Sequence, residues 1–154
     1  MLPNLRNLIN IGIARLFYPT KPLQQVQVDI RDGETRDGLE HAQPYGFAHL
    51  PHPGAETVNL FPGGDKGFGI VIAVHDRRYR MQLTTTGDVA IYDHRGQSVH
   101  LSDSGIVVKS NKLVTLDAPT VKCTGDVEIS GISFLQHVHP GIKLGDASTE
   151  PPSG

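Results

Sequence analysis

Two histidines near the C-terminal end are the residues best suited to chemistry in this sequence. His137 and His139 flank a single valine and precede a Pro-Gly pair. Residues two apart in an extended segment point to the same side, so both imidazoles could turn toward one ion. Two ligands do not complete a metal site. The only cysteine, Cys123, lacks the second cysteine that a zinc finger needs.

Further copies of the chain could supply the missing ligands. If three chains met at an axis here, six imidazoles would surround one point. Six nitrogen donors suit an octahedral ion such as iron(II), nickel or cobalt better than tetrahedral zinc. The alternative interpretation is a pair of solvated histidines in a loop.

A ladder of short strands precedes the histidines and would position them. Residues 96–131 contain no Phe, Tyr or Trp, so one chain has little bulk with which to close a core. Apolar residues recur in couples two apart, which places each couple on one face of a strand. The couples are Val89 and Ile91, Val99 and Leu101, Ile106 and Val108, Val114 and Leu116, Val121 and Cys123, and Val127 and Ile129.

This pattern predicts an intertwined, triple-stranded β-helix over residues 83–136, in which three chains cover one another's apolar faces. An ordinary antiparallel meander of one chain fits the same spacing, because a period of two carries no information on symmetry. Residues 137–154 would then form a metal-binding tip and a C-terminal tail.

The first half of the chain predicts a short helix and a small barrel. Residues 1–19 favour an amphipathic helix, since apolar residues recur at intervals of three and four. A signal peptide is the competing interpretation, but polar residues interrupt the apolar run. Residues 20–82 predict a β-barrel of the oligonucleotide/oligosaccharide-binding (OB) type. Its strands are expected at residues 26–30, 45–50, 56–61 and 67–75.

The composition favours a turn-rich β protein that binds no nucleic acid. The 154 residues include 17 Gly and 11 Pro, and the net charge is −2. The one basic cluster, residues 77–80, is interpreted as a structural junction between barrel and ladder, with Asp76 and Asp93 as countercharges. Acidic residues around a turn at Asp32-Gly33 are interpreted as a hairpin rather than a calcium site. No catalytic motif is found, so we expect no enzymatic activity.

In this order, the segments resemble the Mu-type baseplate assembly and tail spike proteins of contractile-tailed bacteriophages. The most specific motifs are Asp-Arg-Arg-Tyr-Arg at residues 76–80 and the terminal pair His137 and His139. The resemblance implies a homotrimer with an OB-like barrel, a triple-stranded β-helix, and one iron ion that His137 and His139 of three chains hold at the tip.

The function that the resemblance implies is mechanical. The chain would be the central spike of the virion's tail baseplate, made in the host cytoplasm. It would contact the baseplate hub protein and pierce the host outer membrane when the tail contracts. One alternative is a receptor- or glycan-binding tail component, which would need an aromatic platform at the tip. The other is a cell-wall or polysaccharide hydrolase, which would need a carboxylate pair in a cleft.

Overall fold

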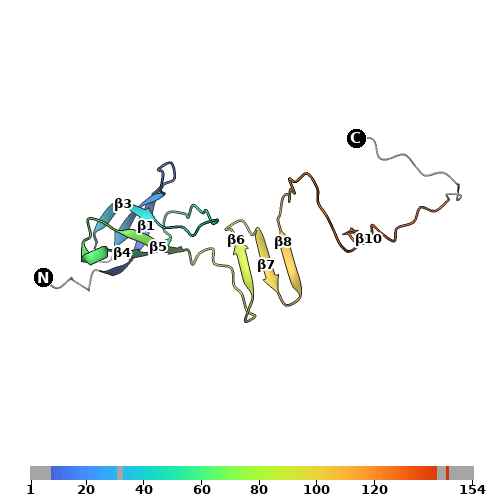
Figure 1. The fold of residues 1–154 in the computed structure, drawn as a ribbon. Coiled ribbons are helices and arrows are strands. Elements are labelled where there is room, and N and C mark those ends of the chain that lie inside the picture. Colours follow the sequence, from blue (N-terminus) through green and yellow to red (C-terminus); the bar gives the residue numbers. More distant parts are fainter. Residues whose placement is uncertain (1–7, 31–32, 142–144, 146–154) are drawn as a thin grey trace. The chain divides into compact units, whose positions relative to one another are not determined.

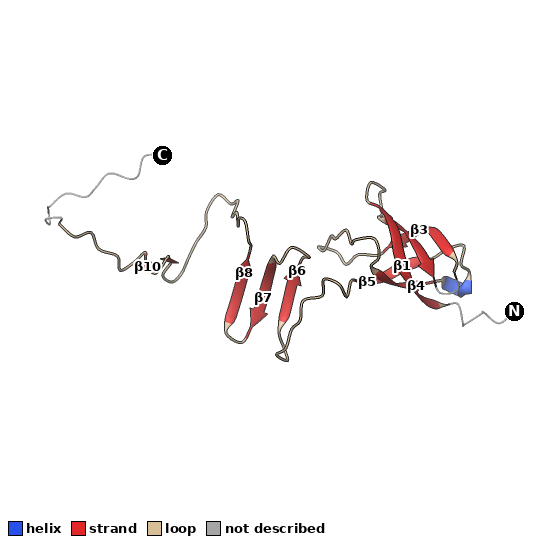
Figure 2. Cartoon of the chain, turned by 180° about the vertical axis from the view of Figure 1, so that it is seen from behind, coloured by secondary structure: helices blue, strands red, loops and turns tan. Residues whose placement is uncertain are grey.

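Ten strands and one short 3₁₀ turn, η2 (Pro62–Gly64), form the regular structure of the described residues (Figures 1 and 2). The computed structural model describes residues 8–30, 33–141 and 145. The chain divides into two compact units, residues 1–113 and 114–154. Within the described ranges, no helix is long and apolar enough to span a membrane.

Five strands of the first unit close into a barrel in the order β1-β2-β3-β5-β4 (Figure 1). They are β1 (Ile9–Tyr18), β2 (Gln25–Ile30), β3 (Thr35–His41), β4 (Glu56–Leu60) and β5 (Ile70–His75). All pairs are antiparallel except β3 with β5, which is parallel. The interior is filled by Ala14, Phe17, Val26, Val28, Ile30, Leu39, Phe61 and Val71. Closure leaves the barrel without a free edge.

The helix predicted for residues 1–19 is wrong over residues 9–18, which form β1; residues 1–7 lie outside the described part. Three isoleucines alternate along the first half of this strand, and β-branched side chains favour strands over helices. A bulge after Ala14 then changes which side chains point inward. As a result, the buried Ala14 and Phe17 are three residues apart, an interval that imitates a helical face.

Three of the four strands predicted for the barrel are confirmed, as β2, β4 and β5. Residues 45–50 are instead a loop, which the side chain of Gln43 holds by donating from Nε2 to the carbonyl of His49 at 2.8 Å. Only the predicted hairpin turn implies a strand at β3, because most of its residues are polar or glycine and show no apolar alternation. Strand β3 pairs antiparallel with β2, as the predicted hairpin requires, although Asp32 itself lies outside the described part.

Strands β6 (Val89–Tyr92), β7 (Ser98–Ser102) and β8 (Gly105–Lys109) form an antiparallel sheet in that order (Figures 1 and 2). The first three apolar couples of the predicted ladder are therefore strands. Within one chain, this sheet has the form of the meander that the sequence also allowed.

The second unit has little regular structure among its described residues. Strands β9 (Glu128–Ile129) and β10 (Ile132–Ser133) pair antiparallel as a small hairpin. The couples at 114–116 and 121–123 are not strands in the single chain. Apart from the half-buried Ser133, every described residue of this unit is exposed, so the unit has no core of its own.

Candidate metal centre

The two histidines singled out in the sequence lie next to each other in the second unit. The ring centroids of His137 and His139 are 5.1 Å apart and the rings are nearly perpendicular, at 83°. Both residues are exposed. The structure thus brings the two imidazoles together on one short segment.

A backbone carbonyl fixes the orientation of the His137 ring. The Nδ1 atom of His137 lies 2.8 Å from the carbonyl oxygen of Phe134. Because a carbonyl oxygen only accepts hydrogen bonds, Nδ1 carries the proton and Nε2 keeps its lone pair. Histidines that bind metals are typically held in this way, with the second ring nitrogen donating to a carbonyl or carboxylate. This contact occupies Nδ1 of His137 and leaves Nε2 as the ring atom that could bind an ion.

Asp126 holds the segment that leads to the histidines, a role that sequence reasoning missed. Its carboxylate accepts hydrogen bonds from the backbone N–H of Val127 at 2.8 Å and of Leu135 at 3.0 Å, and from the hydroxyl of Ser133. The hydroxyl of Ser133 and the N–H of Leu135 lower the pKa of Asp126. The only signal in the sequence was a Gly-Asp turn, and a turn does not reveal a contact nine residues away.

One chain does not complete a metal site in its described residues. No group of three or more His, Cys, Asp or Glu side chains lies close enough there to hold an ion. Cys123 is an exposed free thiol. Among the described residues, the candidate donors at this segment are two exposed imidazoles, which are too few for a metal site.

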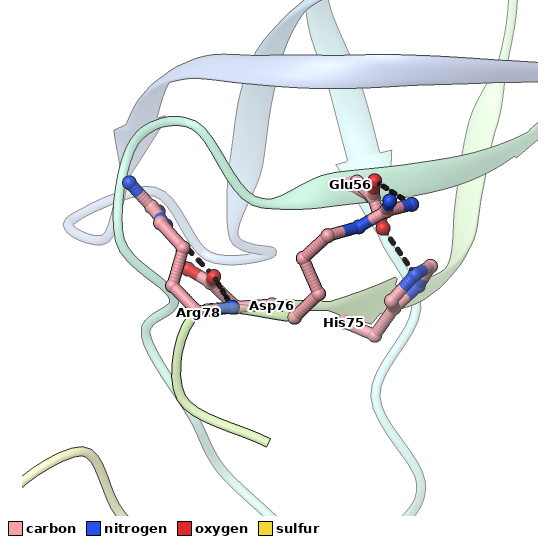
Figure 3. Close-up of polar contacts among 5 residues, drawn as sticks. Glu56, His75, Asp76 and Arg78 are labelled. Carbon is pink, nitrogen blue, oxygen red and sulfur yellow. Dashed lines mark hydrogen bonds and ion pairs between the residues drawn. The ribbon is translucent and has the colours of Figure 1, made fainter.

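The basic cluster predicted as a structural junction is engaged by carboxylates (Figure 3). Glu56 and His75 are opposite each other on β4 and β5, and the Glu56 carboxylate contacts both His75 and Arg77. Arg78 donates from Nε to Asp76 at 2.8 Å. It also donates from Nη2 to the carbonyl of Pro53 at 2.9 Å. The guanidinium of Arg78 lowers the pKa of Asp76.

Aromatic rings extend this junction to the turn between β6 and β7. The His52 ring lies 5.2 Å from Tyr79 and 4.4 Å from His94, measured between ring centroids, and Tyr79 lies 5.5 Å from His94. These contacts agree with the structural role predicted for the cluster. Asp93, which was expected as a countercharge, pairs with Arg95 inside its own turn.

Comparison with known proteins identifies the family. The baseplate puncturing device gp45 of Escherichia phage Mu is 31% identical over 137 residues, which cover 84% of this chain and 70% of the phage protein. The chain belongs to the Mu gp45 family. Its residues 12–78 also match the family model described as Bacteriophage Mu Gp45, N-terminal.

A second Mu gp45 relative comes from a bacterial genome. The Mu-like prophage FluMu protein gp45 of Haemophilus influenzae is 26% identical over 153 residues, which cover 90% of this chain and 84% of the relative. The predicted resemblance to Mu-type baseplate spike proteins is therefore confirmed. The part matched by the family model runs from β1 to the junction residue Arg78, and so spans the barrel.

Proposed function

We propose that this Mu gp45 family protein is the central spike of a contractile phage-tail baseplate, and that it acts as a homotrimer that pierces the host outer membrane. The structural role in the baseplate follows from the relative named as a baseplate puncturing device. Features of the chain itself support the trimer, the β-helix and the shared metal.

The observation that carries the proposal is the uncovered aliphatic face of the β6–β7–β8 sheet. Two cross-strand rows lie on this face, because paired residues of neighbouring strands point to the same side. The rows are Val89, Leu101 and Ile106, and Ile91, Val99 and Val108. In one chain, Ile91 is 59% exposed and Ile106 is 69% exposed. A sheet face of six aliphatic residues requires a cover.

The second unit, like the sheet, leaves aliphatic side chains exposed in one chain. Its apolar side chains are exposed, among them Val114, Leu116, Val121 and Ile129. These residues continue the couples of the sheet, yet each is more than half exposed in one chain. Three copies wound around one axis would cover all of these side chains and would leave few free strand edges. This arrangement is the triple-stranded β-helix.

The same axis would complete the metal centre. Three copies of His137 and His139 supply six imidazoles, and the ring orientation set by Phe134 leaves Nε2 of His137 free to bind. An octahedral set of nitrogen donors suits iron(II). A metal bound there would hold the ends of three chains together. A puncturing tip needs this mechanical link rather than an active site.

The proposal is tested by light scattering on the purified, untagged protein, with elemental analysis of the same peak. We expect a mass three times the 16.7 kDa of one chain, with one iron for every three chains. The double variant His137→Ala/His139→Ala is the control and should lose the iron while it keeps the trimeric mass. A monomeric mass would overturn the spike proposal. A metal-free trimer would remove only the metal from it.

A further inference from the structure

The outer surface of the barrel carries a second uncovered aliphatic face, separate from that of the β6–β7–β8 sheet. We call it the barrel belt, and it lies on β1, β4 and β5. The strand registers place Ile9 beside Leu60 and Leu60 beside Ile70 in one row. The belt comprises Ile9, Ile11, Ile13, Val58, Leu60, Ile70, Ile72 and Ala73.

The alternation of β4 shows that the belt is an outer face. Thr57 and Asn59, the two polar residues of the strand's centre, are fully buried in the barrel. Val58 and Leu60 lie between them in sequence and therefore point outward. On β1, Gly12 is buried against Val28, whereas Ile11 is 55% exposed. Strand β4 thus places its polar side chains inside the barrel and its aliphatic side chains outside. This is the reverse of a barrel whose outer face contacts water.

The outer face of β2 lacks this character. The outward residues of β2 are Gln25, Gln27 and Asp29, which suit contact with water. At one end, the belt stops at the row of Ile13, Glu56 and His75, where Arg77 also contacts Glu56. The first two rows of the belt contain no charged side chain, so a partner recognised by charge does not fit them.

The barrel also adjoins the sheet that is proposed to trimerise. The ring contacts of His52 and Tyr79 with His94 join the barrel side to the β6–β7 turn, and the hydrogen bond from Arg78 to Pro53 holds the segment after β5 to the loop before β4. If three sheets assemble, three barrels are brought to the same axis, which gives them a high local concentration for one another.

From these observations we infer that the barrel belt is the contact between barrels, with the belts of three copies packed around the symmetry axis. This inference rests on the proposed trimer and assigns to it a second interface, distinct from the sheet and from the tip. The occupant of the belt is another copy of this chain.

The test uses the rate at which single cysteines react with a maleimide in the full-length protein. The native thiol is first removed by Cys123→Ser. Ile11→Cys and Ile72→Cys then report on the belt, Gln27→Cys is the matched control on the polar side of the barrel, and Leu101→Cys reports on the sheet face. Light scattering of the same samples gives their mass.

In a trimer, we expect the belt cysteines to react at least about tenfold more slowly than Gln27→Cys, since burial blocks access to the thiol. Slow reaction at Leu101→Cys together with rates at Ile11→Cys and Ile72→Cys equal to the control would overturn the inference and leave the spike proposal intact. Fast reaction at all positions with a monomeric mass would overturn both. Protection of the belt that appears only when a baseplate hub protein is added would give the belt to that partner and also overturn the inference.

Discussion

At the scale of single residues, Asp126 organises the segment that carries the histidines. Its carboxylate connects the start of the β9–β10 hairpin to Ser133 and Leu135. These hydrogen bonds favour the ionised carboxylate and lower its pKa. The carboxylate consequently keeps its charge, and its contacts, down to lower pH than an ordinary aspartate.

Removal of this carboxylate should loosen the metal centre without removing a ligand. The test uses nickel, which like iron(II) suits an octahedral set of nitrogen donors. We expect Asp126→Ala to weaken nickel binding by about tenfold, because loss of groups that support metal ligands typically has effects of this size. Titration calorimetry on metal-free protein measures the affinity. Asp117→Ala, in an exposed irregular segment of the same unit, is the control and should bind as the parent does. Equal affinity in both variants would show that Asp126 does not position the ligands.

A second residue-scale prediction concerns the buried His41. Burial, and then the nearby His49, lower the pKa of His41 from 6.5 to about 4. Its Nδ1 donates to the side-chain oxygen of Gln24 at 2.7 Å. The unfolded chain binds a proton near pH 6.5, whereas the folded barrel does so only near pH 4. Folding stability should therefore fall as the pH decreases between these values, by roughly 3 kcal/mol from this group.

Urea unfolding of the barrel across this pH window measures the effect. His41→Gln removes the titrating group, and the stability of that variant should depend less steeply on pH between 6.5 and 4. An unchanged slope would mean that His41 is not the group responsible.

At the scale of elements, the barrel depends on close contact between β1 and β2. A Cβ atom on Gly12 would lie 2.7 Å from the carbonyl oxygen of Asp29 and would also collide with Val28. We expect Gly12→Ala to destabilise the barrel by about 1–3 kcal/mol, as overpacking of a filled core does. Thermal unfolding measures this change, and a variant as stable as the parent would show that the two strands separate easily.

How well the sequence predicted these elements depended on how regular each strand is. The β6–β7–β8 sheet was predicted because Val99, Leu101 and their neighbours alternate without interruption. Strand β1 was mistaken for a helix because the bulge after Ala14 breaks that alternation. Strand β3 could be expected only from the hairpin turn before it, because its own residues are mostly polar.

The sequence predicts the two candidate ligands but not the groups that hold them. His137 and His139 stand out by residue type and spacing alone. The parts that hold them, the carboxylate of Asp126 and the carbonyl of Phe134, depend on chain geometry that residue types do not encode. A period of two likewise carries no information on the symmetry of the proposed trimer.

At the scale of the whole molecule, the role of the aliphatic face of the β6–β7–β8 sheet can be tested by the same substitution on its two opposite faces. Val99 and Ser98 are neighbours on β7 and point to opposite sides. In the proposed trimer, Val99→Asp would bury three carboxylates against aliphatic side chains, which is strongly unfavourable. Ser98→Asp would place the same charge on the other face.

We therefore expect Val99→Asp to abolish the trimer and phage infectivity, and Ser98→Asp to preserve both. Light scattering and plaque counts on complemented phage measure the two outcomes. Equal behaviour of the two variants would contradict the assignment of this face to the trimer interface.

The closure of the barrel has a consequence for its behaviour under stress. Strands β3 and β5 join through only two residue pairs, Glu40 with Ile70 and His41 with Val71. One of these four residues is His41. Burial lowers its pKa in the closed barrel, so acid favours protonation of His41 once the barrel opens. Acid should therefore split the barrel along this seam first and turn a closed cylinder into a ribbon with two bare edges. Such edges pair readily with those of other molecules, so isolated protein should aggregate from a partly opened barrel rather than from a fully unfolded chain.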